Sequence, residues 1–222
     1  MEKTLKDQSS EDRDQTRMRR APTQKRSRER VDHILACATE LIAANGSDTM
    51  RMSELAERAG ISIGSLYQYF PDKAAIVRAL AERCNAESRH CIEEGLAGVE
   101  TPEDLGQAFN ALIDTYYELF LTEPVMRDIW SGMQADATLR ALELEENREN
   151  ARILTRTLLR LRPDGEPAAI ESAALLVMSL GEAAMRLAIS VERDEGDRLV
   201  ATYKRMAAVE LKRLVAAAPP LP

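Results

Sequence analysis

The chain has 222 residues, of which 45% are hydrophobic and 30% charged, so it can bury one large or two modest cores and is not disordered throughout. Charged residues interrupt every apolar run before the roughly 20 residues that a membrane span needs, and the first 30 residues lack the apolar segment of a signal peptide. We therefore expect a cytoplasmic protein with no membrane partner. Its three cysteines, Cys37, Cys84 and Cys91, are predicted to be free thiols, as is usual in that compartment.

The net charge of −7 is unevenly distributed along the chain. Residues 17–83 carry 12 basic and 8 acidic side chains, whereas residues 84–222 carry 15 and 24. Seven of the basic residues lie between 17 and 30. Residues 1–24 are polar and without apolar periodicity, so they are predicted to be a disordered tail of mixed basic and acidic character. Two interpretations of the basic stretch stand: a solvated tail, or an arm that follows nucleic-acid phosphates.

Helix-forming residues dominate nearly every window of the sequence, which predicts an all-α fold. The first helical period ends at Asn45-Gly46. A short helix follows and is broken at Gly60, and Ser62 can cap the next one. Pro71-Asp72 suits the first turn of a fourth helix. The helices predicted for this part of the chain lie at about 27–45, 53–58, 62–70 and 71–97.

Five longer helices are predicted for the rest of the chain. Thr101-Pro102-Glu103-Asp104 has the cap, the first-turn proline and the acidic third position of a helix start. The predicted ranges are about 101–123, 124–133, 136–161, 168–191 and 195–217. The helix at 168–191 is apolar around most of its circumference, so it must be covered on more than one side. It is either an ordinary core helix or part of a subunit interface, and we expect a homodimer formed through residues 168–216.

The most informative stretch is LAERAGISIGSLYQYFPDK, residues 55–73. Two short helices separated by a tight turn at Gly60 are typical of a helix-turn-helix, whose second helix lies in the DNA major groove. The residues predicted to form its small core are Leu55, Ala56, Ala59, Ile61, Leu66 and Phe70, which leaves Ser62, Gly64, Ser65, Tyr67 and Tyr69 for the outer face. Gly64 costs helix stability, and it suits a place where the backbone comes close to another surface.

This pattern resembles the tetracycline-repressor (TetR/AcrR) family of transcriptional regulators. The resemblance runs from about Arg28 to Arg83 through Ala44-Asn45-Gly46, Leu55-Ala56-x-x-Ala59-Gly60-Ile61-Ser62 and Gly64-x-x-Tyr67-x-x-Phe70-x-x-Lys73, about a quarter of the chain. It implies a three-helix DNA-binding domain at 25–72 and a helical effector-binding and dimerisation domain at 73–222. It also implies a homodimer that binds double-stranded DNA at a palindromic operator.

The resemblance assigns DNA contacts to residues near the second short helix. The expected set is Arg51, Ser53, Ser62, Ile63, Gly64, Ser65, Tyr67, Tyr69 and Lys73. Ile63, Gly64 and Ser65 occupy the positions that reach base edges, although Ile63 can only touch a thymine methyl. The two tyrosines and Lys73 occupy those that hold the DNA backbone. Arg51 departs from the usual Ser or Thr, which leaves the cap of its helix open, and each tyrosine has the alternative of supporting the fold.

No motif identifies an effector. The residues expected to line an effector site are apolar or aromatic ones of the C-terminal helices with a few polar groups: Phe109, Tyr116, Tyr117, Phe120, Arg127, Trp130, Met133 and Met178. Each has the alternative of being plain core. No cofactor or metal is expected, because His33 and His90 are the only histidines and we interpret both as solvent-facing or capping residues.

Two other classes of protein are alternatives to a ligand-responsive regulator. A helical enzyme lacks support, since there is no glycine-rich phosphate loop, no His-Glu-x-x-His and no nucleophile elbow. An architectural DNA-binding protein without ligand control is harder to distinguish from a regulator by sequence. Loss of DNA binding on addition of an effector would identify the regulator. The sequence therefore predicts a transcriptional regulator, a repressor released from its operator by a small molecule.

Overall fold

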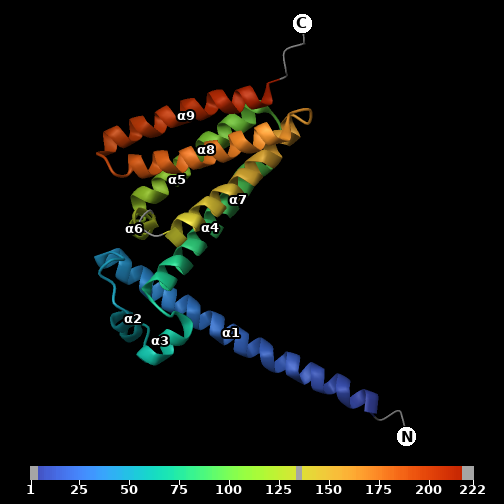
Figure 1. Ribbon diagram of the computed structural model, residues 1–222, viewed down its shortest axis with the longest axis vertical. Coiled ribbons are helices and arrows are strands. Elements are labelled where there is room, and N and C mark those ends of the chain that lie inside the picture. Colours follow the sequence, from blue (N-terminus) through green and yellow to red (C-terminus); the bar gives the residue numbers. More distant parts are fainter. Residues whose placement is uncertain (1–4, 134–136, 217–222) are drawn as a thin grey trace. The chain divides into compact units, whose positions relative to one another are not determined.

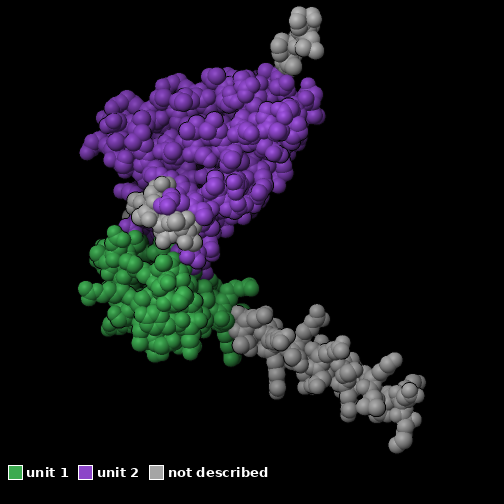
Figure 2. All heavy atoms as spheres, viewed as in Figure 1, with its two compact units in different colours: residues 1–77 green, residues 78–222 purple. Residues whose placement is uncertain are grey.

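The computed structural model describes residues 5–133 and 137–216, with the side chains of 25–216 except 124 and 130–139. The helices are α1 (Leu5–Asn45), α2 (Met52–Arg58), α3 (Ile63–Tyr69), α4 (Lys73–Ala97), α5 (Pro102–Thr122), α6 (Pro124–Met133), α7 (Ala137–Leu161), α8 (Pro167–Ala188) and α9 (Arg193–Val215) (Figure 1). There is no strand in these described ranges, and the all-α prediction is confirmed. The chain forms two compact units, residues 1–77 and 78–222 (Figure 2).

Capping residues set the helix starts where the sequence predicts them. At α5, the Thr101 hydroxyl accepts a hydrogen bond from the Asp104 N–H (3.1 Å), and the Asp104 carboxylate accepts one from the Thr101 N–H (2.9 Å). The hydrogen bond with Thr101 also holds the pKa of Asp104 below its usual value. At α4, the Asp72 carboxylate accepts a hydrogen bond from the Ala75 N–H at 2.7 Å. Each interaction satisfies amide groups that a helix start would otherwise leave unpaired.

The first helix is longer than predicted. α1 begins at Leu5, whereas the sequence predicts a disordered tail through residue 24. Residues 5–24 include four Arg and three Gln, which favour helix even without an apolar face, and periodicity detects only the helices that bury one. Residues 1–4 and the predicted start of α7 at Asp136 lie outside the described residues.

The first unit is a small helical core that supports α3. The fully buried side chains are Ile34, Leu35 and Ala38 of α1, Leu55 of α2, Leu66 of α3 and Ile76 of α4. The predicted core residue Ile61 is half-buried instead, because it lies in the turn between α2 and α3. Burying one aliphatic side chain is worth about 1.5–3 kcal/mol, so this core fixes α3 although that helix is only seven residues long.

The second unit is built around α8, which packs against α7 and α9. Gly181 permits the close approach of α9, since a Cβ there would lie 2.8 Å from the Tyr203 hydroxyl oxygen. That hydroxyl donates to the Val177 carbonyl oxygen at 2.7 Å. By length and composition α8 could cross a membrane, but a core helix packed between neighbours meets the same test. The charged residues Glu182 and Arg186 also lie on this helix.

Candidate DNA-binding surface and buried polar cluster

The turn between α2 and α3 holds the helix-turn-helix in a fixed geometry. Gly60 has φ +63°, a backbone conformation that favours glycine, and its N–H donates to the Glu57 carbonyl oxygen at 3.0 Å. The Ile61 N–H donates to the Ala56 carbonyl oxygen at 3.0 Å. Ser62 then caps α3, with its hydroxyl oxygen accepting from the Ser65 N–H at 3.1 Å. Gly60 and Ser62 therefore have the roles that the sequence predicts, since Gly60 makes the turn and Ser62 caps α3.

The outward face of α3 presents the residues predicted to read DNA. Ser62, Ile63, Gly64 and Tyr67 are exposed, with Ile63 at 43% and Tyr67 at 50% of their full accessible area. A Cβ added at Gly64 would meet no atom within 4 Å. The structure thus gives Gly64 no packing reason to be glycine. Such exposure of Tyr67 suits a surface contact better than the alternative of supporting the fold.

The remaining predicted contacts surround this face. Ser65 and Tyr69 are half-buried, so Tyr69 is compatible with both of its interpretations. Arg51 is the extended N-cap of α2 and makes no side-chain capping hydrogen bond, and like Ser53 it is exposed. Lys73 is half-buried, and its Nζ donates to the Asp48 carbonyl oxygen at 2.9 Å. An ammonium has three N–H donors, so two remain for a phosphate.

Several residues predicted for an effector site make packing contacts within the second unit. The Phe109 ring lies 6.4 Å from that of Tyr203 on α9. The Arg193 guanidinium lies 5.3 Å from the ring centre of Tyr117, which is buried near the start of α9. Arg127 is exposed, and it donates to the last carbonyl groups of α5, including the Leu121 oxygen at 3.0 Å. These contacts are those of core and helix-capping residues.

Other members of that predicted set lie elsewhere. Tyr116 contacts Phe120 edge to face at 4.9 Å. Burial and then the Glu182 carboxylate raise the pKa of Tyr116 well above its usual value, while a hydrogen bond with Ser88 of α4 lowers it. Met178 is half-buried one turn before Glu182. The side chains of Trp130 and Met133 lie outside the described residues.

Near Tyr116 lies a polar cluster that was not predicted from the sequence. We define the Glu182 cluster as Glu143 and Asn147 of α7 with Glu182 and Arg186 of α8. Arg186 donates to Glu143 at 2.6 Å and to Glu182 at 3.1 Å, and the Asn147 amide donates to the other oxygen of Glu182. Glu182 is only 7% exposed. The available signal was a Glu and an Arg four residues apart in the largely apolar second half of α8.

Burial makes the Glu182 carboxyl hard to ionise. Desolvation, and after it the neighbouring Glu143, raise the pKa of Glu182 to about 8 against the lowering effects of Asn147 and Arg186. Arg186 pairs with both Glu143 and Glu182, and the raised pKa of Glu182 favours its protonated form near neutral pH. A buried carboxyl of this kind is typical of functional sites, although structural networks also contain them.

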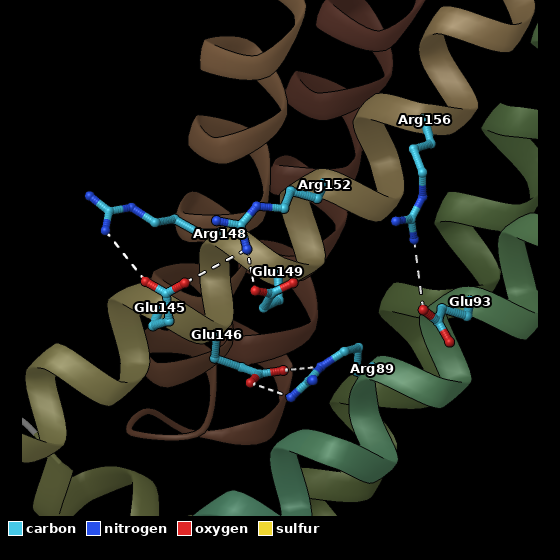
Figure 3. A network of polar contacts seen from close by, with 8 residues as sticks. All are labelled: Arg89, Glu93, Glu145, Glu146, Arg148, Glu149, Arg152 and Arg156. Carbon is cyan, nitrogen blue, oxygen red and sulfur yellow. Dashed lines mark hydrogen bonds and ion pairs between the residues drawn. The ribbon is translucent and has the colours of Figure 1, made fainter.

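Ion pairs connect α4 to α7 (Figure 3). Arg89 of α4 donates through two nitrogens to Glu146 of α7, at 2.8 and 3.1 Å. Arg156 of α7 lies 3.7 Å from Glu93 of α4. Exposed pairs such as the second contribute at most about 1 kcal/mol, whereas the Arg89–Glu146 pair is bidentate and part-buried. α4 therefore has a specific polar contact with α7 one turn from the Glu182 cluster.

A Glu182→Gln variant should remove a large pH dependence of stability. The pKa of Glu182 is higher in the folded state than in the unfolded state. Its contribution to the free energy of unfolding is therefore greatest below about pH 4.5 and falls as the pH rises to about 8. The loss is several kcal/mol, at about 1.4 kcal/mol per unit of pKa difference. Urea unfolding at a series of pH values measures it. A wild-type curve that stays parallel to the variant's across this range would contradict the buried, protonated carboxyl.

Exposed apolar residues lie on the last two helices, α8 and α9. We define the α8–α9 stripe as the large exposed apolar residues of these helices: Leu176, Leu180, Leu187, Met206 and Val209. The leucines follow one another at spacings that return to one face of α8. This stripe falls inside the range 168–216 predicted to form the dimer, and it shows which side of α8 remains uncovered in a single chain.

Comparison with known proteins agrees with this arrangement. Residues 34–80 match the model of the tetR family of bacterial regulatory proteins, and residues 103–215 match that of the tetracyclin repressor-like C-terminal domain. An uncharacterised HTH-type transcriptional regulator of Bacillus subtilis, YvdT, is 30% identical over 51% of the chain. The nucleoid occlusion factor SlmA of Shewanella baltica is 34% identical over 24%. The matched parts cover 58% and 27% of these two relatives, so the chain spans about half their length or less.

Solved structures share the fold at low sequence identity. A TetR-family regulator from Streptomyces coelicolor has a TM-score of 0.63 at 22% identity, covering 83% of this chain and 99% of that one. One from Pectobacterium atrosepticum has 0.65 at 20%, covering 86% and 97%. RolR in complex with its ligand resorcinol has 0.58 at 21%, covering 90% and 98%. The fold and the helix-turn-helix define a DNA-binding transcriptional regulator. The chain belongs to the tetR family.

Proposed function

We propose that this protein is a cytoplasmic homodimeric repressor that binds a palindromic operator and is released from it by a small molecule. The observation that carries the proposal is the continuity of α4. Its first turn belongs to the unit that contains the helix-turn-helix and holds Lys73, whereas Ser88 and Arg89 of the same helix contact residues of the second unit near Glu182. A ligand that shifts this helix in the second unit therefore acts on the DNA-binding unit. The resorcinol bound by RolR supports small-molecule binding in this fold.

The mechanism requires two recognition helices at a set separation. A dimer occupies successive major grooves when its two α3 helices lie about 34–36 Å apart, or a small multiple of that distance. A ligand that favours another separation lowers operator affinity, by no more than its difference in affinity for the two states. The exposed outer face of α3 supplies the base-reading surface, and Lys73 with the tyrosines supplies the phosphate contacts.

Selection of bound sequences from a random pool of duplex DNA tests the DNA half of the proposal. At near-physiological salt, we expect an inverted repeat, whose half-site spacing gives the separation of the two α3 helices. Once the operator is known, fluorescence anisotropy measures whether a compound releases it. A folded dimer that selects no motif would contradict sequence-specific binding, and operator affinity that no bound ligand alters would favour an architectural protein.

Lys73→Ala should weaken binding to every DNA sequence alike. Loss of one phosphate contact reduces the slope of log affinity against log salt concentration by about one unit, without changing the order of preferred sequences. Anisotropy titrations at several salt concentrations measure the slope. Lys212→Ala, which removes an exposed lysine of α9, is the matched control and should leave both quantities unchanged. An unaltered slope in Lys73→Ala would remove its phosphate role and leave only its hydrogen bond to Asp48.

A further inference from the structure

The side of α3 that faces away from the core is opposite Leu66. The Leu66 side chain is fully buried, and successive residues of a helix point about 100° apart. The positions two before and two after Leu66 therefore lie on the opposite side of the helix, and they hold Gly64 and Gln68. Both residues are exposed. Gln68 thus lies at the centre of the outward face, although it is not among the residues predicted from the sequence to contact DNA.

Gly64 leaves open space beside the Gln68 side chain. Side chains of an α-helix lean toward its N-terminus, in the direction of the residue four positions earlier, which for Gln68 is Gly64. A Cβ at Gly64 would meet no atom within 4 Å, so the packing of the protein does not require a glycine there. A glycine inside a helix lowers stability. Its missing side chain opens a path along which the Gln68 amide group and the edge of a base can meet.

Ile63 borders this face and offers an apolar contact. It is 43% exposed in the first turn of α3. The hydroxyl groups nearby are less available, because that of Ser62 accepts the capping hydrogen bond from the Ser65 N–H at 3.1 Å and Ser65 itself is half-buried. An exposed aliphatic side chain on a surface that meets the major groove can contact the methyl group of thymine, which the other three bases lack. The outward face therefore supplies one amide group and one apolar group for reading bases.

We propose that Gln68 and Ile63 determine the sequence specificity of the operator, whose half-site contains an adenine read by Gln68 and a thymine read by Ile63. The proposal rests on the proposed function, because it names the bases that the DNA-binding surface recognises. The Gln68 amide nitrogen donates to adenine N7, and its oxygen accepts from the adenine N6 amino group, a pair of groups that no other base offers in the major groove. The Ile63 side chain packs against the thymine methyl group. Tyr67 and Lys73 hold the DNA backbone and so position both base contacts.

Operators with small chemical changes in single bases test the proposal. In the selected operator, each adenine is replaced in turn by 7-deazaadenine, which lacks the N7 acceptor, and each thymine by uracil, which lacks the methyl group. Fluorescence anisotropy with the full chain measures affinity. We expect one adenine per half-site whose replacement lowers affinity about fivefold or more, since it leaves an N–H of Gln68 unpaired. We also expect one thymine per half-site whose replacement lowers affinity about fourfold, the effect of one buried methyl group.

Two variants assign these effects to the two side chains. Gln68→Ala should lower operator affinity about tenfold or more, and the adenine replacement should then have no further effect, since the hydrogen bond it removes is already absent. Ile63→Ala should in the same way cancel only the effect of the thymine replacement. Both residues are exposed, so both variants should fold, which thermal unfolding checks. Gln107→Ala, which changes an exposed glutamine of α5, is the matched control and should leave affinity and both base effects unchanged.

These titrations separate the two base contacts from the repressor function. A base effect of the same size in wild type and in the corresponding variant would overturn the assignment of that base to that side chain. A selected motif in which no adenine or thymine responds to replacement would overturn both assignments. Either result leaves sequence-specific binding in place, since the motif itself has been selected. A folded dimer that selects no motif contradicts the proposed function and the base contacts together.

Discussion

Replacing Gly64 by leucine is expected to abolish specific operator binding while leaving the protein folded. A Cβ at Gly64 meets no atom within 4 Å, and the residue is exposed in the first turn of α3, so the free protein accommodates the larger side chain. Removing a helical glycine should even stabilise the protein, by up to about 1 kcal/mol. In the complex, the added side chain occupies the space through which the α3 backbone approaches DNA. We expect a loss of at least about 100-fold in affinity, since steric exclusion removes several base contacts worth about 1–3 kcal/mol each.

Anisotropy with the selected operator, together with thermal unfolding of the same samples, measures both effects. Gly98→Leu is the matched control, because Gly98 is also exposed with open space around its Cβ position but follows α4 at its far end. It should leave operator affinity unchanged. Operator affinity within about threefold of wild type in Gly64→Leu would refute close contact between this part of α3 and DNA.

Replacing Leu180 by aspartate is expected to convert the dimer to monomers and, through that, to remove high-affinity operator binding. Leu180 lies within the α8–α9 stripe and is 44% exposed in the single chain. In a two-fold symmetric interface, one substitution introduces two buried carboxylates. Each loses apolar burial worth about 1.5–3 kcal/mol and adds the cost of an unpaired charge, so the dissociation constant should rise at least about 100-fold.

Sedimentation equilibrium over a range of protein concentrations measures this dissociation constant. Leu144→Asp is the control, since Leu144 is 45% exposed on α7 and does not belong to the α8–α9 stripe. It should leave the dimer intact. An unchanged dimer in Leu180→Asp, or dissociation by Leu144→Asp instead, would place the interface on another surface.

The sequence determined the elements and the DNA-binding motif, because these depend on local interactions. Apolar periodicity and the caps Ser62, Asp72 and Thr101 set helix boundaries within a few residues for every helix except α1 and the start of α7. α1 extends further because its polar first half favours helix without burying a face. Gly60 predicted the turn, since a positive φ is a property of one residue and its neighbours.

The interior of the second unit was decided only by tertiary structure. Tyr116 and Tyr117 are adjacent in sequence, yet one is close to Glu182 and the other lies under Arg193, because neighbouring helical positions point about 100° apart and meet different helices. The raised pKa of Glu182 has the same origin: Glu143, 39 positions earlier, becomes its neighbour only when α7 packs on α8. Local patterns fix where helices begin and end, whereas burial and charge pairing depend on which helix faces are brought together.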